Sequence, residues 1–129
     1  MKINFSSLTI ILSGLFFFFA SCSKEKIDEN IYEIRYKVEG SGGVAITSVR
    51  YNTDNDGGVE VITIPEEAGA SSFESDTTYK LKQRNAYIVV YATGSDNNST
   101  LKTQIFKNGV LAKEYTRTGK NLGTELGLP

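Results

Sequence analysis

The sequence has no histidine, no tryptophan and only one cysteine among its 129 residues. Histidine is the commonest general base and a common metal ligand, so its absence excludes a Ser-His-Asp or Cys-His catalytic site and a Cys/His zinc site. A single cysteine excludes a disulfide within the chain, and the lack of tryptophan argues against binding by stacking on sugars or bases. We therefore expect no enzymatic activity and no cofactor.

Charge is nearly balanced, with 14 Lys and Arg against 15 Asp and Glu. Lys2 is the only charged residue before position 22, so a chain that begins at Cys22 has a net charge of −2. Because there is no basic surplus, nucleic acid is not expected as a partner. The length suits one small domain, which its apolar core must stabilise without a disulfide.

The single cysteine, Cys22, directly follows a short hydrophobic run at residues 8–20. Lys2 precedes the run and small residues flank the cysteine, as in a secretory signal peptide. The run is shorter than the roughly 20 apolar residues that span a membrane. Residues 19–22 (FASC) resemble the lipobox of bacterial lipoproteins, in which the acylated cysteine anchors the protein to the membrane. We predict a signal peptide at 1–21 and lipidation of Cys22.

Residues 23–30 are polar and charged, so we expect the segment 22–30 to be the lipidated cysteine and a flexible tether. The predicted signal peptide and lipidated cysteine indicate a membrane-anchored protein of the cell envelope. In a Gram-negative host the expected place is the outer membrane, on its periplasmic face or at the cell surface. Two other interpretations remain open: an ordinary signal peptide with an incidental cysteine nearby, and an uncleaved anchor helix.

The rest of the chain shows the alternation of apolar and polar residues that is typical of half-buried β-strands. Such stretches occur at residues 32–38, 44–51, 59–64, 73–82, 86–92, 101–105 and 110–115. Pro65 ends the third stretch, and Asn108-Gly109 predicts a hairpin between the last two. About seven short strands at even spacing predict an all-β antiparallel sandwich over residues 31–119, followed by a Gly-rich C-terminal tail at 120–129.

One loop has the oxygen-rich composition of a calcium site. Residues 52–58 (NTDNDGG) with Glu60 place carboxylates at Asp54, Asp56 and Glu60, and a hard cation binds such oxygens around a sharp glycine turn. An EF-hand loop would need a bidentate glutamate at its twelfth position, where this chain has Thr63. A turn between two strands explains the same residues, so we favour the turn and expect no bound metal.

Other candidate residues have plainer explanations. Glu66 and Glu67 could act as paired carboxylates in acid–base chemistry, but a solvated loop explains them better. Residues 76–78 (DTT) resemble an acceptor for O-glycosylation in Bacteroidetes-type envelopes, which makes Thr77 a weak candidate. The tyrosines are expected to contribute to core and cross-strand packing rather than to a ligand platform; this set comprises Tyr32, Tyr36, Tyr79, Tyr87, Tyr91 and Tyr115.

The mature domain resembles the extracytoplasmic domain of the MmpS family, small membrane proteins that accompany lipid-exporting transporters. The matching stretches lie within residues 32–119 and are YKVEG at 36–40, AIT at 45–47, RYN at 50–52, GG at 57–58, IP at 64–65 and QIFKNGV at 104–110. The resemblance implies an immunoglobulin-like β-sandwich without catalytic residues. This chain departs from the family in its lipobox-like start, its lack of a cysteine pair, and Glu66 where an aromatic residue tends to follow the Leu-Pro motif.

We expect a lipid-anchored envelope protein with a non-catalytic binding or accessory sandwich. The resemblance implies an accessory subunit of an envelope transporter, with a protein partner in the envelope. The alternative is a stand-alone surface or periplasmic module that binds a peptide, a polysaccharide or a matrix component.

Overall fold

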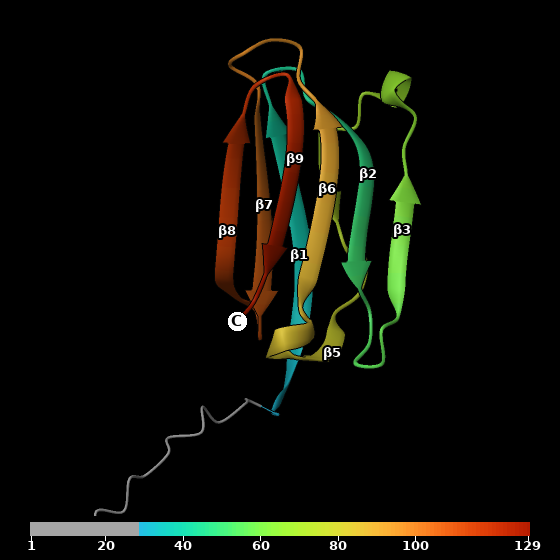
Figure 1. The fold of residues 1–129 in the computed structure, drawn as a ribbon, viewed down its shortest axis with the longest axis vertical. Helices are drawn as coiled ribbons and strands as arrows, with labels where there is room; N and C mark the ends of the chain where they lie inside the picture. Colours follow the sequence, from blue (N-terminus) through green and yellow to red (C-terminus); the bar gives the residue numbers. More distant parts are fainter. Residues whose placement is uncertain (1–28) are drawn as a thin grey trace, which may run out of the picture.

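Two antiparallel sheets pack face to face in the computed structural model, which describes residues 29–129 (Figure 1). In chain order the elements are β1 (Ile31–Ser41), β2 (Ala45–Asn52), β3 (Val59–Thr63), the 3₁₀ helix η1 (Glu66–Ala68), β4 (Ser72–Glu74), β5 (Tyr79–Lys82), the 3₁₀ helix η2 (Gln83–Asn85), β6 (Tyr87–Thr93), β7 (Thr100–Lys107), β8 (Val110–Thr118) and β9 (Asn121–Gly127). Sheet A has the order β4-β1-β7-β8, with β5 also paired to β1, and sheet B has the order β3-β2-β6-β9. The predicted all-β antiparallel sandwich is confirmed.

The described residues form nine strands rather than about seven. The stretch at 73–82, predicted as one strand, is divided into β4 and β5. The four residues 75–78 connect β4 to β5 opposite only two residues of β1. This is because β4 pairs with β1 from Lys37 onward, whereas β5 pairs with β1 up to Ile34. Ser75 turns inward there, and its backbone N–H donates to the Tyr36 carbonyl (3.0 Å). The extra residues therefore bulge out of the ladder between the two strands.

Residues 120–129 are not a tail outside the domain, contrary to the prediction. They contain β9, which pairs with β6 over its full length and forms one edge of sheet B. Leu122, Leu126 and Leu128 are buried in the core. In the sequence, glycines at two positions of β9 interrupt the apolar–polar pattern that predicts a half-buried strand. The sandwich therefore extends to the C-terminus, well beyond the predicted boundary at residue 119.

The core is formed by the inward-facing residues of both sheets, and its centre is aromatic. Tyr36 is fully buried, and its ring centroid lies 5.1 Å from that of Tyr51 and 6.4 Å from that of Tyr79. The hydroxyl groups of Thr103 on β7 and Thr124 on β9 are hydrogen-bonded between the two sheets (2.6 Å). Neither buried hydroxyl is therefore left without a partner. Buried apolar area is the main favourable term in such a domain, which has no disulfide to assist it.

The β7–β8 hairpin predicted from Asn108-Gly109 is confirmed. Both turn residues have positive φ, 51° at Asn108 and 79° at Gly109, as the tight hairpin turn requires. The Asn108 side chain also accepts a hydrogen bond from the Glu33 backbone N–H (2.9 Å), which fixes the turn against β1. The turn thereby sets the register of β8, the strand at the open edge of sheet A.

Candidate functional site

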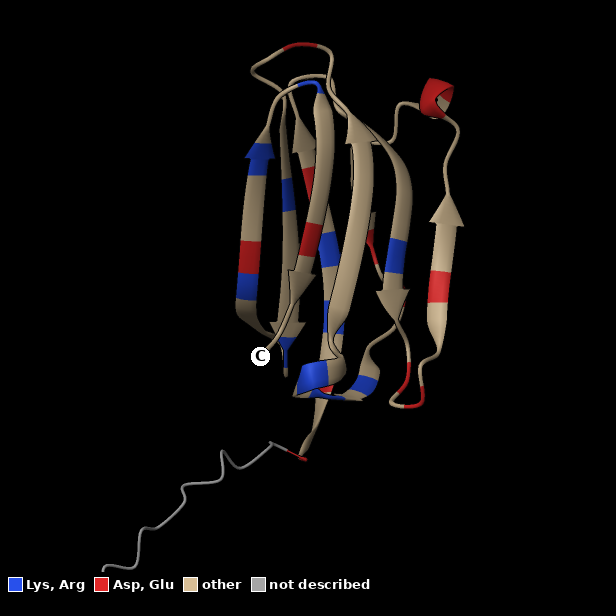
Figure 2. Ribbon diagram, viewed as in Figure 1, with Lys and Arg blue, Asp and Glu red and all other residues tan. Residues whose placement is uncertain are grey.

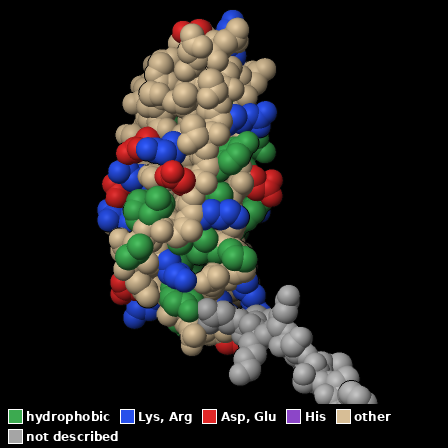
Figure 3. Space-filling model, turned by 90° about the vertical axis from the view of Figure 1, so that its left-hand side faces the viewer, with side chains coloured by type: hydrophobic (Ala, Val, Ile, Leu, Met, Phe, Trp, Pro, Cys, Tyr) green, Lys and Arg blue, Asp and Glu red, His purple; other side chains and the backbone are tan. Residues whose placement is uncertain are grey.

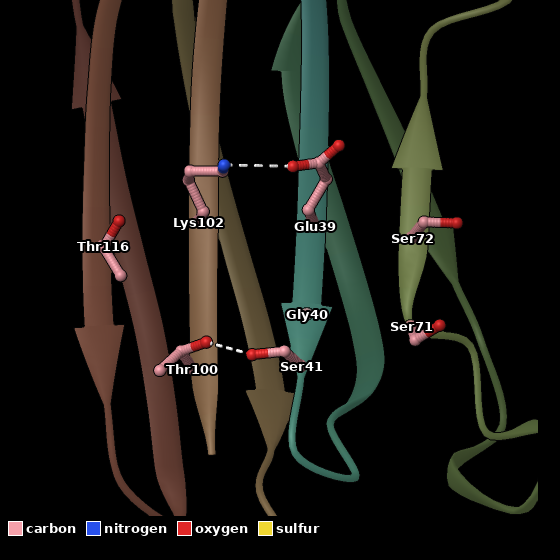
Figure 4. Close-up of a pocket in the computed structure, with 8 residues that line it drawn as sticks. All are labelled: Glu39, Gly40, Ser41, Ser71, Ser72, Thr100, Lys102 and Thr116. Carbon is pink, nitrogen blue, oxygen red and sulfur yellow. Dashed lines mark hydrogen bonds and ion pairs between the residues drawn. The ribbon is translucent and has the colours of Figure 1, made fainter. Parts of the chain in front are cut away.

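A shallow groove of about 540 Å³ crosses the outer face of sheet A near the end of β1 (Figure 4). It is lined by Glu39, Gly40, Ser41, Ser71, Ser72, Thr100, Lys102 and Thr116. These residues come from β1, β4, β7, β8 and the segment before β4, so the groove crosses the whole width of the sheet. Five of the eight side chains are serine or threonine, and hydroxyl groups therefore dominate the lining.

Strand alternation and register position these side chains. Glu39 and Ser41 point outward because Val38 and Gly40, the residues of the other parity, face the core. The β1–β7 register places Lys102 opposite Glu39 and Thr100 opposite Ser41. A Cβ atom at position 40 would lie 2.7 Å from the Val44 side chain, so only glycine fits there without displacing the chain.

The two charged residues of the groove neutralise each other. Glu39 forms an ion pair with Lys102 across the strands (3.2 Å) and another with Lys37 on its own strand (2.9 Å). Hydrogen bonds from Lys37 and Lys102 hold the pKa of Glu39 below its usual range, and the bond to Glu39 raises the pKa of Lys37. Glu39 is therefore a carboxylate at neutral pH and is poorly suited to donate a proton as a general acid.

The groove can form hydrogen bonds in many directions. Hydroxyl groups both donate and accept, and Figure 4 shows Ser41 bonded to Thr100 beside the Glu39–Lys102 pair. None of the eight lining residues is a histidine or a cysteine, and the one carboxylate is engaged by two lysines. The arrangement suits the binding of a polar ligand that is rich in hydroxyl groups better than it suits acid–base or nucleophilic chemistry.

The groove lies far from the point where the chain enters the domain. β1 begins at Ile31 and ends at Ser41, and ten residue steps of an extended strand span about 33 Å. Figure 1 shows β1 running from the lower end of the domain, where the described residues begin, to the upper end. A ligand in the groove is therefore held at the opposite end of the sandwich from residue 29, the first described residue.

The candidate calcium residues do not come together as a metal site. Asp54 Oδ1 accepts hydrogen bonds from the backbone N–H groups of Asp56 (2.8 Å) and Gly58 (2.7 Å), which lower its pKa. Glu60 lies on β3 and accepts a hydrogen bond from the Tyr79 hydroxyl (3.4 Å). Residues 29–129 contain no group of three His, Cys, Asp or Glu side chains that could hold a metal ion. Asp54 thus stabilises the turn through its backbone contacts.

A neighbouring asparagine is a structural residue that the sequence analysis missed. Asn55 Oδ1 accepts hydrogen bonds from the Lys82 backbone N–H (2.7 Å) and from Asn85 Nδ2 (3.0 Å). It thereby joins the β2–β3 loop to η2, which is distant in sequence. No local pattern distinguishes this asparagine from the others in the loop, so only the tertiary arrangement reveals its role.

The two glutamates and the glycosylation candidate are on the surface. Glu66 and Glu67 are exposed in η1, and Glu66 Oε1 accepts a hydrogen bond from the Thr93 hydroxyl (3.1 Å). Thr77 is exposed in the β4–β5 loop, and its carbonyl accepts a hydrogen bond from Ser75 Oγ (3.1 Å). Modification of Thr77 stays a prediction.

The predicted tyrosine set divides between the core and the surface. Tyr36 is fully buried, and Tyr32 and Tyr79 pack against the core. Tyr87 and Tyr91 face outward on β6, opposite Gly127 and Gly123 of β9, whose missing side chains leave room for the tyrosine rings. Tyr115 is 48% exposed on β8.

Cys22, the predicted lipidation site, lies outside the described residues together with the predicted signal peptide. Within residues 29–129, no helix has the length and apolar character needed to cross a membrane. A scan against models of known protein families finds no match to this chain, and a search of curated proteins finds none. Its function is therefore inferred from the groove and from the sequence.

Proposed function

We propose that this protein is a non-catalytic binding module of the cell envelope, anchored by lipid on Cys22, and that the groove on sheet A binds a hydroxyl-rich polysaccharide. The observation that carries the proposal is the lining of the groove, in which five hydroxyl side chains surround one neutralised ion pair. Polysaccharides present hydroxyl groups at close intervals, and each can donate to one groove hydroxyl and accept from another.

The position of the groove supports this proposal. A lipid on Cys22 would hold the domain by its N-terminal end, whereas the groove lies about 33 Å away at the far end of β1. The domain would then present the groove away from the membrane, where a polysaccharide chain is accessible. The open shape of the groove also suits a chain that continues beyond the bound sugars at both ends.

Affinity electrophoresis tests the binding function. The full-length protein in detergent is run through native gels that contain a soluble neutral β-glucan, a mannan or a xylan, and at least one polymer should retard it. Replacing the cross-strand pair Ser41→Ala with Thr100→Val removes two hydroxyl groups from the groove. At about 1 kcal/mol for each hydrogen bond, affinity should fall roughly tenfold or more.

A matched control is available on the other sheet. Ser48 and Thr63 also form a cross-strand pair, and Ser48→Ala with Thr63→Val makes the same chemical change on sheet B. This variant should bind as the unchanged protein does. Equal loss of binding in both variants, or no retardation by any polymer, would remove the groove as a polysaccharide site.

The anchor has a separate test. Mass spectrometry of the membrane fraction should find acyl chains on Cys22, and globomycin should block processing of the precursor. Cys22→Ala should move the protein from the membrane fraction to the soluble fraction. If processing and membrane retention were unchanged in this variant, the protein would not be a lipoprotein, whatever the groove binds.

The exposed apolar side chains of β8 favour a second candidate function, contact with another protein. Val110 is 69% exposed, Leu111 43% and Tyr115 48%, so one strand carries three exposed large apolar side chains, and apolar patches of this kind mark contact sites. The resemblance to MmpS proteins implies a transporter as the partner, with this chain as its accessory subunit. Copurification after crosslinking distinguishes the two functions, because only the accessory subunit should bring down an envelope transporter.

A further inference from the structure

β8 is the most exposed strand of the described chain. All nine of its residues, Val110–Thr118, are exposed, although β7 pairs with the strand along its full length. β8 is the last strand of sheet A, so its other side carries backbone groups without a strand partner. Leu111 (43% exposed) and Tyr115 (48%) add apolar surface to this edge. Such an edge is a surface on which another chain can dock.

The charge of this edge is basic. Residues 107–129 contain four Lys and Arg and two Glu, for a net charge of +2. Lys113 donates to the Gly127 carbonyl (2.9 Å) and Arg117 to the Gly123 carbonyl (2.9 Å), so both side chains lie along the seam between β8 and β9. Neither has a carboxylate within ion-pair distance in the described part of the chain. Figure 3 shows hydrophobic side chains interspersed with Lys and Arg, and with some Asp and Glu, on this side of the molecule. We call β8 with Lys113 and Arg117 the basic edge.

The opposite side of the sandwich is acidic. Residues 54–76 contain seven Asp and Glu and no Lys or Arg. Figure 2 shows the acidic residues of the β2–β3 loop, β3 and η1 along the side away from β8. β3 is itself an edge strand, and Val59 (37% exposed) and Val61 (59%) make part of its surface apolar. We call β3 with Asp54, Asp56 and Glu60 the acidic edge.

We propose that β8 docks a second copy of this protein, so that the basic edge of one molecule lies against the acidic edge of the next. Each edge carries exposed apolar side chains, and the net charges of the two edges are opposite. β8 holds Lys113 and Arg117 against the single carboxylate Glu114, whereas residues 54–76 contain no Lys or Arg. Two basic edges repel each other, as do two acidic edges, so the charges oppose symmetric pairing and favour only the unlike contact. Contacts of this head-to-tail kind repeat from copy to copy and build a row or a ring.

The direction of the strands agrees with such a row on one membrane, an argument that rests on the proposed lipid anchor. β1, β3 and β8 all run from the lower end of the domain to the upper end (Figure 1). Side-by-side copies with their N-terminal ends at the same membrane therefore bring β3 and β8 together in parallel. Antiparallel pairing of two β8 strands would instead point the two N-terminal ends in opposite directions.

Engineered cysteines test the contact in the full-length protein within the envelope. We expect the double variant Val61→Cys with Tyr115→Cys to form a disulfide-linked ladder of dimers, trimers and larger species under mild oxidation. Each single variant should remain monomeric, because a head-to-tail contact never brings two copies of the same position together. Co-expression of the two single variants should yield dimers only. The unchanged protein controls for any crosslinking through Cys22.

Charge reversal tests why the copies associate. Lys113→Glu with Arg117→Glu should weaken association at least tenfold, which corresponds to about 1.4 kcal/mol, and high salt should reduce the ladder because the charges are exposed. Lys80→Glu with Arg84→Glu makes the same charge change away from β8 and should leave the ladder intact. Circular dichroism checks that each variant is folded.

Three outcomes would overturn the proposal. No ladder in the double variant would show that β8 does not bind a second copy. A dimer formed by Tyr115→Cys alone would indicate a symmetric β8 contact. A product of another mass would identify a different protein on this edge. The ladder should persist for Cys22→Ala at high protein concentration, so that loss of the anchor and loss of the contact are told apart.

Discussion

Removing one buried hydroxyl, in the variant Tyr36→Phe, should destabilise the whole domain. Tyr36 is fully buried, and its hydroxyl donates to the Asn52 carbonyl (3.0 Å) and accepts a hydrogen bond from the Tyr87 backbone N–H (3.3 Å). These bonds tie β1 of sheet A to β2 and β6 of sheet B. Phenylalanine preserves the ring and its aromatic contacts, so the substitution isolates the hydroxyl.

The expected loss follows from the cost of unpaired buried groups. Each hydrogen bond contributes about 1 kcal/mol net, and a buried group left unpaired costs about 1–3 kcal/mol. We expect Tyr36→Phe to lower the free energy of unfolding by about 2 kcal/mol. For a domain of this size, that change lowers the melting temperature by roughly 10 °C. Urea unfolding followed by circular dichroism measures the first quantity, and a thermal scan measures the second.

Tyr91→Phe is the matched control, because Tyr91 is 58% exposed on the outer face of β6. Removing its hydroxyl should change the free energy of unfolding by less than about 0.5 kcal/mol. If Tyr36→Phe were no more destabilising than Tyr91→Phe, the hydroxyl of Tyr36 would not join the sheets, and the reasoning about the core would be refuted.

Three further predictions concern pH, a glycine and the acidic loop. Burial raises the pKa of Tyr36 above the ordinary value of about 10. The contribution of the neutral hydroxyl to stability is therefore complete below about pH 10 and is lost as the pH rises further. In an alkaline titration, the free energy of unfolding should fall less for Tyr36→Phe than for the unchanged protein. Gly94→Ala should lower the free energy of unfolding by about 1–3 kcal/mol, because the new Cβ would overlap the Gly119 carbonyl oxygen. In the same urea unfolding assay Gly123→Ala should be nearly neutral, because its Cβ would meet the Tyr91 ring at an ordinary 3.6 Å. Millimolar calcium should not raise the melting temperature relative to EDTA. At a real site, calcium at a hundred times its dissociation constant would add about 2.7 kcal/mol to the free energy of unfolding. A large rise in melting temperature that Asp54→Asn abolishes would contradict the turn interpretation.

Much of the sandwich could be predicted from the sequence because its central strands are half buried. Their side chains alternate between core and solvent, which produces the period-two pattern of β1 and β7. The Asn108-Gly109 hairpin was predictable for a local reason, since its two positive φ values favour these residue types. The pattern did not reveal β9, because glycine stands at two of its seven positions; a Cβ at position 127 would crowd the Tyr87 ring at 3.1 Å, whereas one at position 123 would make an ordinary contact with Tyr91.

The groove could not be predicted, because it depends on register between distant parts of the chain. Ser41 and Thr100 lie 59 residues apart in sequence, and only the β1–β7 pairing brings their hydroxyl groups together. Serine and threonine are also common in surface strands and loops, so neither residue is distinctive alone. The two edges posed the same difficulty, since their opposite charges become visible only after the sheet order places β3 and β8 on opposite sides.

The two proposals reinforce each other through the geometry of the strands. A row of copies in contact through β3 and β8 keeps every β1 in the same direction, so the grooves at the ends of β1 would all lie at the same distance from the membrane. A polysaccharide chain could then occupy several grooves at once, and each contact after the first would be intramolecular. Weak binding in a single shallow groove would become strong binding along the row. Lys113→Glu with Arg117→Glu should therefore weaken retention on a long polysaccharide much more than on a short oligosaccharide, although neither residue lines the groove.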